Sequence, residues 1–147
     1  ESQFSPIRNG PVQSALLWAL EAWIRDGTTP PASRIIQIGR DENDRRIIEV
    51  DANGNALGGV RHPMVEVPRG TYLAHNVPLP CFLAGAFITF DTTTLQALYP
   101  SRAFYLEQVR QALSRAIFER FLLPEASPTI ISQALQHAGD SVDPGRP

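Results

Sequence analysis

The chain has 147 residues, of which 43% are apolar and 19% are charged, a balance typical of one globular domain with a core rather than of a disordered chain. Its formal net charge of -2 excludes the basic field that a nucleic-acid partner requires. No apolar run approaches the roughly 18 residues that span a bilayer, so we expect no membrane span.

The chain begins with Glu1 rather than Met. We expect that an upstream part has been removed by signal cleavage, by proteolysis or by the choice of the expressed segment. Signal cleavage would make the mature chain secreted or periplasmic. The single cysteine, Cys81, cannot form an internal disulfide and lies in an apolar run. We therefore expect a buried free thiol, with a bridge to another chain as the alternative.

A helix is predicted from Asn9 to Gly27, because Asn9-Gly10-Pro11 is typical of a helix start and Gly27 of a helix end. Most of its apolar residues recur at spacings of three and four, and two more lie off that stripe. We therefore expect the helix to contact more than one neighbour. The stripe consists of Val12, Ala15, Leu16, Ala19, Leu20, Trp23 and Ile24, and the two others are Leu17 and Trp18.

Short strands are predicted at residues 35–38, 47–50, 64–67 and 71–74, where β-branched and alternating apolar residues occur between turn signals. The stretch from Asp51 to Asn55 is similar to the start of a calcium loop. Its Gly54 falls one place early, however, and no glutamate follows at the right distance, so a hairpin turn is favoured. A polar link then leads to Cys81–Phe90, an uncharged run that we expect to be buried on both faces, with a close backbone approach at Gly85.

Three helices are predicted after this run. The first covers residues 95–99, with N-cap candidates from Asp91 to Thr94, and the second starts after Ser101 and ends at Pro124. Ser127-Pro128 should begin the third, which Gly139 should end. The apolar face of the second is predicted to consist of Tyr105, Leu106, Val109, Ala112, Leu113, Ala116, Ile117 and Phe121.

The chain lacks the usual sequence signals of catalysis. No serine lies in a Gly-x-Ser-x-Gly nucleophile elbow, and no histidine has a second metal ligand at a ligand spacing, so no metal site is predicted. His62 is interpreted as a loop residue, His137 as a cation at a helix C-terminus and His75 as structural or exposed. An independent enzyme that uses His75 is the weakest of the functions considered.

Four stretches of the chain carry a family resemblance: residues 9–32, 51–68, 81–90 and 97–124. In this order and spacing they resemble the C-terminal third of a bacterial α/β-hydrolase-domain family of esterase-like enzymes. The resemblance covers nearly the whole chain and implies an α/β fold of which this is the C-terminal portion. It implies that the catalytic Ser, acid and His all precede the chain, so that no catalytic residue and no cofactor are expected within it.

The resemblance also implies an organisation and a partner. Residues 1–33 would hold the last helix of the hydrolase core and an exit linker, 34–90 the short strands, 91–139 a helical C-terminal cap and 140–147 a tail. The partner would be the N-terminal catalytic part, as a separate chain or a missing segment, acting on a small-molecule ester. Candidate pocket residues are Tyr72, His75, Cys81 and Gly85. The alternative from another class is a non-catalytic binding or scaffolding domain.

Overall fold

The computed structural model describes residues 3–74 and 85–138, which fold into two compact units. The first unit is made of Glu1–Ser5, Ala32–Arg61 and Gly70–Thr89, and the second of Pro6–Pro31, His62–Arg69 and Phe90–Pro147. Both helices and strands are present, so the fold is mixed α/β as predicted. Within the described ranges, no helix is both long and apolar enough to cross a membrane.

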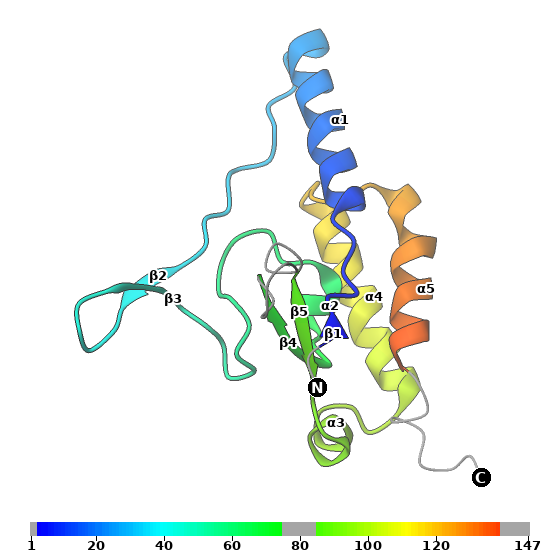
Figure 1. Ribbon diagram of the computed structural model, residues 1–147. Coiled ribbons are helices and arrows are strands. Elements are labelled where there is room, and N and C mark those ends of the chain that lie inside the picture. Colours follow the sequence, from blue (N-terminus) through cyan, green and yellow to red (C-terminus); the bar gives the residue numbers. More distant parts are fainter. Residues whose placement is uncertain (1–2, 75–84, 139–147) are drawn as a thin grey trace. The chain divides into compact units, whose positions relative to one another are not determined.

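The first unit contains a three-stranded antiparallel sheet in the order β1-β5-β4 (Figure 1). Its strands are β1 (Gln3–Phe4), β4 (Gly70–Leu73) and β5 (Ala86–Thr89). In β5, Ala86 and Phe87 are buried, whereas Ile88 is 44% exposed. The expectation of burial on both faces is therefore wrong for this part of the run. The reason is that a small antiparallel sheet can leave one face of its central strand exposed to water.

A hairpin forms the rest of the first unit. Strands β2 (Ile38–Arg40) and β3 (Arg46–Ile48) pair antiparallel. The strand predicted at 47–50 overlaps β3 by two residues, whereas the strand predicted at 35–38 shares only Ile38 with β2. Where the hairpin begins, three backbone segments meet in a ring of hydrogen bonds: the N–H of Glu49 donates to Gln37 O (3.0 Å), that of Gln37 to Leu57 O (2.9 Å), and that of Leu57 to Glu49 O (2.9 Å). This ring holds the otherwise thin hairpin at its base.

The second unit is helical. It begins with α1 (Gly10–Asp26), which has Pro11 in its first turn and Gly27 at φ 71° as its C-cap, as predicted. Helix α3 (Thr92–Leu98) is capped by Asp91, whose side chain accepts the N–H of Thr94 at 2.7 Å. Helix α4 (Arg102–Phe118) is capped by Ser101 in the same way, through the N–H of Phe104. These caps satisfy N–H groups that have no partner within the helix.

Helix α4 ends at Phe118, earlier than the predicted Pro124. Arg120 takes the left-handed conformation with φ 64°. Its N–H donates to Ile117 O, and the N–H of Phe121 donates to Ala116 O, which is the hydrogen-bond pattern of a Schellman C-cap. The prediction missed this end because Arg120 stands where a glycine is usual, while the burial of Phe121 supplies the apolar contact that stabilises the motif.

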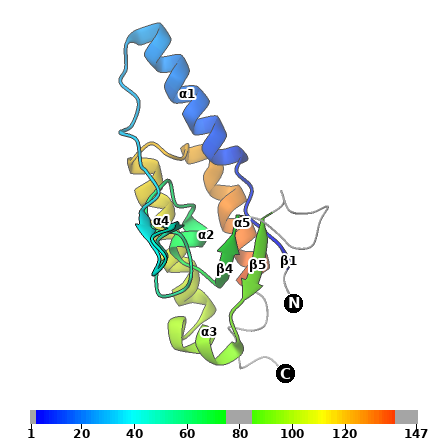
Figure 2. The same cartoon turned by 60° about the vertical axis from the view of Figure 1, so that its left-hand side comes forward.

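The core of the second unit lies between α4 and α5 (Ser127–Ala138), which pack against each other (Figure 2). A 3-10 turn, η2 (Pro124–Ala126), precedes α5. Of the predicted apolar face of α4, five residues are buried, and Ala116 and Ile117 pack at the core's edge. The core comprises Val67, Leu95, Tyr99, Tyr105, Leu106, Val109, Ala112, Leu113, Leu122, Ile130, Ala134 and Ala138.

The predicted strand at 64–67 is wrong, because Pro63–Glu66 forms the short helix α2. His62 is extended and accepts the N–H of Met64 at Nδ1, and Pro63 suits the first helical position. Helix α2 packs against α4 and buries Pro63 and Met64. The alternation of apolar and polar residues is equally compatible with one turn of helix, and the tertiary contact decides between the two.

Candidate functional site

Two of the four candidate pocket residues, Tyr72 and Gly85, lie on the sheet of the first unit. Tyr72 is half-buried in β4, opposite Phe87 of β5, and the two rings lie 4.8 Å apart at 37°. Gly85 precedes β5, and its carbonyl accepts the N–H of Ser5 at 2.9 Å. A Cβ at Gly85 would meet Leu73 O at 3.0 Å, so the predicted close backbone approach is confirmed. His75 and Cys81 lie outside the described residues.

Asn55, which sequence reasoning missed, closes the open edge of β4. It is fully buried, and its Oδ1 accepts the N–H of Tyr72 at 2.7 Å while its Nδ2 donates to Gly70 O at 3.2 Å. One amide side chain thus supplies the acceptor and the donor that a neighbouring strand would supply. We call this pair of hydrogen bonds the Asn55 contact. Nothing near Asn55 in the sequence identifies it, because its partners lie 15 and 17 residues away.

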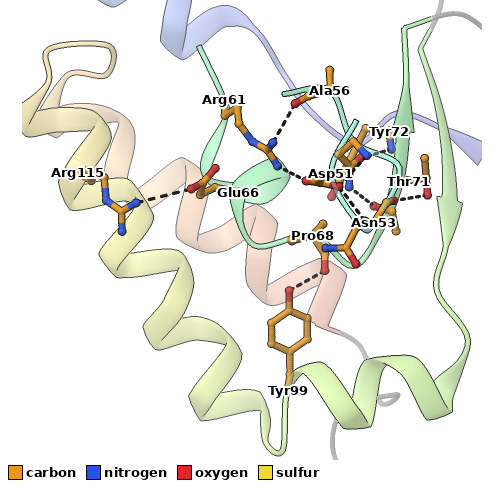
Figure 3. Close-up of polar contacts among 12 residues, drawn as sticks. Asp51, Asn53, Ala56, Arg61, Glu66, Pro68, Thr71, Tyr72, Tyr99 and Arg115 are labelled. Atoms are coloured by element: carbon orange, nitrogen blue, oxygen red, sulfur yellow. Dashed lines mark hydrogen bonds and ion pairs between the residues drawn. The ribbon is translucent and has the colours of Figure 1, made fainter. Parts of the chain in front are cut away.

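Asp51 organises the turn that carries Asn55 (Figure 3). Its Oδ1 accepts the backbone N–H of Asn53 (2.9 Å) and of Asn55 (3.0 Å), and its Oδ2 pairs with Arg61 at 2.7 Å. Burial raises the pKa of Asp51, but Arg61 and the two N–H groups outweigh it and hold the pKa below its usual value. The N–H of Gly54 donates to Asp51 O at 2.9 Å, and Val50 and Ala56 form an antiparallel bridge across the turn, so the predicted hairpin turn is confirmed.

The second unit holds a buried cluster of polar aromatic residues and an arginine that the sequence did not reveal. The Arg69 guanidinium lies 5.4 Å from the centre of the Tyr105 ring, and Tyr105 meets Tyr99 edge to face at 5.0 Å. Tyr99 donates its hydroxyl to Pro68 O at 2.7 Å (Figure 3). Burial raises the pKa of Tyr105 to about 12 and that of Tyr99 above its usual value. Both hydroxyls therefore stay protonated at neutral pH.

The two described histidines have different environments. His62 is buried, and burial lowers its pKa to about 4. Because its Nδ1 accepts the Met64 N–H, the ring is neutral with its proton on Nε2, and His62 is a helix cap rather than a loop residue. His137 lies in the last turn of α5, but burial and Arg69 lower its pKa. This opposes its predicted role as a cation.

Helix α1 exposes the large apolar side chains from which more than one neighbour was predicted. Its buried side is made of Ala15, Ala19 and Ala22. At 3.6 residues per turn, five of the exposed residues share an arc of about 120°, and Trp18 lies beyond the alanine side. We call these five residues the α1 apolar arc. They are Leu16 (46% exposed), Leu17 (67%), Leu20 (46%), Trp23 (55%) and Ile24 (77%), and Trp18 is 49% exposed.

The polar side of α1 needs no partner for its charges. Arg25 pairs with Glu21 and with Asp26, each at 2.8 Å. A surface that docks on the α1 apolar arc would therefore meet uncharged side chains only. Exposed apolar patches of this size, on the order of 500 Å² if each side chain offers roughly 200 Å² when fully exposed, are typical of interaction sites.

Neither of the two histidines in the described ranges contacts a nucleophile. Within the two described ranges, neither His62 nor His137 is hydrogen-bonded to a serine, threonine or cysteine, which is the contact that activates a hydroxyl or thiol. In the same ranges, no three His, Cys, Asp or Glu side chains converge as metal ligands. The geometry thus offers packing surfaces and buried polar contacts.

Comparison with known proteins gives one result. The model of the family described as "Alpha/beta hydrolase domain" matches residues 1–132. No curated protein and no solved structure matches the chain. The family match takes in residues of both compact units, including α1, the Asn55 contact and α4, and it ends within α5 at residue 132. This chain therefore belongs to the alpha/beta hydrolase domain family.

Proposed function

We propose that this chain is the non-catalytic C-terminal part of a serine carboxyl-ester hydrolase. In this function it completes the fold and shapes the substrate pocket, while residues outside it supply the Ser–His–acid triad. The observation that carries the proposal is the exposure of the α1 apolar arc within a chain of the alpha/beta hydrolase domain family. Helices of α/β proteins bury such faces against a parallel sheet.

The sheets of the described residues support this assignment. Both are antiparallel, and their strands have two to four residues. A hydrolase nucleophile elbow stands on a strand-to-helix turn of an α/β sheet, and the sequence has no Gly-x-Ser-x-Gly. We infer that the sheet that positions the nucleophile belongs to the catalytic part, and that α1 covers one of its faces.

The pocket proposal concerns the sheet of the first unit. Tyr72 lies in β4, and Gly85 directly precedes the neighbouring strand β5. The sequence that connects those strands carries His75 and Cys81. We propose that these four residues contribute to the wall of the ester pocket, with the acyl or alcohol group against them. Small-molecule sites combine apolar walls with a few polar groups, and this set offers both.

The coding sequence beside the codon for Glu1 tests the proposal most directly. It should encode a Gly-x-Ser-x-Gly followed by an acid and a histidine. Produced together with this chain, that segment should hydrolyse short acyl esters. Ile24→Asp, which places a charge within the exposed α1 apolar arc, should weaken the association, whereas Glu21→Ala should not. A start codon beside Glu1 with no such segment in the neighbourhood would refute the proposal.

A binding or scaffolding domain is the second candidate, and the core of the second unit favours it. Twelve residues from five segments, among them the fully buried Tyr105, Val109 and Ile130, pack there without a partner. Such a unit could be stable alone. The two candidates differ in the behaviour of the purified chain: a binding domain should be a stable monomer, whereas the hydrolase part should self-associate or bind apolar dyes through the α1 apolar arc.

A further inference from the structure

The chain contains two Asn-Gly pairs, Asn9-Gly10 and Asn53-Gly54. In such a pair the backbone nitrogen of the glycine can attack the asparagine side-chain amide, because glycine has no Cβ to hinder the approach. We propose that Asn53 is a deamidation site that the folded first unit keeps closed, and that its conversion to isoaspartate opens the Asn55 contact. The proposal concerns the chain's own covalent chemistry and does not depend on the hydrolase assignment.

The reaction needs only water. The Gly54 nitrogen gives up its proton and bonds to Cγ of Asn53, and the Cγ–Nδ2 bond breaks to release ammonia and leave a five-membered succinimide. Water then opens the ring at one of its two carbonyls. One opening yields aspartate and the other isoaspartate, in which the main chain runs through the former side chain. The net change is one water consumed and one ammonia released.

Hydrogen bonds fix the backbone groups of Asn53 and Gly54 that would have to rotate for the ring to close. The N–H of Gly54 donates to Asp51 O at 2.9 Å, and the N–H of Asn53 donates to Asp51 Oδ1 at 2.9 Å. The carbonyl of Asn53 accepts the Thr71 hydroxyl at 2.9 Å (Figure 3). The attacking nitrogen is therefore engaged as a donor. Turning it toward Cγ of Asn53 requires rotation about ψ of Asn53, which breaks the turn.

The other pair, Asn9-Gly10, serves as a reference in the same molecule. The carbonyl of Asn9 accepts the N–H of Gln13 at 3.0 Å, so this pair differs from Asn53-Gly54 mainly at the attacking nitrogen and the side chain. Asn9 is exposed and its side chain caps nothing. Gly10 is the first residue of α1, a position whose N–H has no partner within a helix. The two pairs have the same chemistry in an unfolded chain, so a difference between their rates in the folded chain reports on the structure around Asn53.

Isoaspartate at position 53 would strain a short segment that is anchored at both ends. Asp51 is tied to Arg61, and Asn55 is tied to Gly70 and Tyr72 of β4. The modification inserts one extra backbone carbon between these anchors and adds a carboxylate near the Asp51 carboxylate. The added length shifts Asn55 along the chain, and the β4 edge loses the donor and acceptor that one buried amide supplies.

The first experiment incubates the intact chain at mildly alkaline pH, with and without guanidinium chloride, and follows Asn9 and Asn53 by peptide mapping and mass spectrometry. In denaturant both should deamidate at similar rates. In the folded chain the rate at Asn53 should be at least about tenfold lower than in denaturant, since only the fraction of molecules with an open turn reacts. Equal rates at Asn53 with and without denaturant would refute the protection of Asn53 by the fold. If Asn9 reacts in denaturant and Asn53 does not, Asn53 is not a deamidation site.

Thr71→Val tests the contact itself, because it removes the hydroxyl that holds Asn53 O and keeps a β-branched side chain in the strand. It should raise the folded-state rate at Asn53 severalfold and leave the rate at Asn9 unchanged. Acceleration at both sites would show general destabilisation instead and would count against a specific role of this contact.

The second experiment tests the consequence by comparing the isolated isoaspartate form with Asn53→Asp, which carries the same charge on a normal backbone. Hydrogen exchange of the Tyr72 amide reports on the Asn55 contact directly. It should become about tenfold faster in the isoaspartate form and change by less than about twofold in Asn53→Asp. Unchanged exchange in the isoaspartate form, or equal acceleration in both, would refute the opening by backbone lengthening.

Discussion

The side-chain Oδ1 of Asn55 accepts the backbone N–H of Tyr72 at 2.7 Å, and it does so from a fully buried position. Tyr72 faces Phe87 across the β4–β5 pair, so this bond lies on the opposite edge of β4. A residue in a turn thereby completes the hydrogen bonding of a strand that is short of a neighbour.

Replacing Asn55 by Ala should lower the free energy of unfolding by about 2 kcal/mol. The change removes the partner of the buried Gly70 carbonyl and of the part-buried Tyr72 N–H, and a polar group left unsatisfied by such a change costs about 1 to 3 kcal/mol. Chemical denaturation followed by circular dichroism measures it. The control is Asn43→Ala in the exposed hairpin tip, with an expected change within about 0.5 kcal/mol. An equal effect of the two changes would mean that the Asn55 contact does not stabilise the unit.

Leu113→Ala should destabilise the chain by about 2 to 5 kcal/mol, since Leu113 is 4% exposed in the core of the second unit. Ile117→Ala should fall at the lower end, because Ile117 packs only at the edge of the core. Arg110→Ala should cost under about 1 kcal/mol, because Arg110 is exposed and its ion pair with Glu107 is long, at 3.9 Å. Thermal unfolding of the three variants checks this order.

Tryptophan fluorescence should report on α1 alone, because Trp18 and Trp23 are the only tryptophans and both lie on this helix. Both indoles are about half exposed, so the emission of the isolated chain should be red-shifted and readily quenched by acrylamide. Docking of the proposed catalytic part should shift the emission to the blue. A blue-shifted, unquenchable emission from the chain alone would show that the helix is already covered.

Between about pH 6.5 and pH 4 the chain should lose stability as the pH falls. Burial lowers the pKa of His62 to about 4 in the folded state. The unfolded chain therefore binds more protons in this range, and the stabilisation is complete only above the ordinary histidine pKa of about 6.5. The loss should approach about 3 kcal/mol near pH 4. His62→Asn, which keeps a capping oxygen, should flatten the profile in denaturant titrations at several pH values.

Assayed alone on short acyl esters, the chain should show no turnover above background, because neither His62 nor His137 is hydrogen-bonded to a serine, threonine or cysteine within the described residues. The assay should use several independent preparations of the purified chain to exclude a contaminating esterase. Turnover that survives purification and disappears in His75→Ala would contradict the proposal and support an independent enzyme.

Local signals in the sequence were enough to predict the elements whose ends depend on a few neighbouring residues. The caps at Asp91 and Ser101, the end of α1 at Gly27 and the turn at Asp51 all involve hydrogen bonds within four residues or so of one another. The apolar spacing of α4 likewise predicted its buried face, because one side of a regular helix meets one neighbour.

Tertiary contacts decided the features that depend on distant residues. The apolar stripe of α1 did not indicate which side is buried, since the buried side consists of three alanines while the larger residues stay exposed. The helix at Pro63–Glu66 follows from its packing on α4. Asn55 meets β4, and Arg69 meets Tyr105, only after folding. Side chains far apart in sequence acquire partners through the fold, and no local pattern records that pairing.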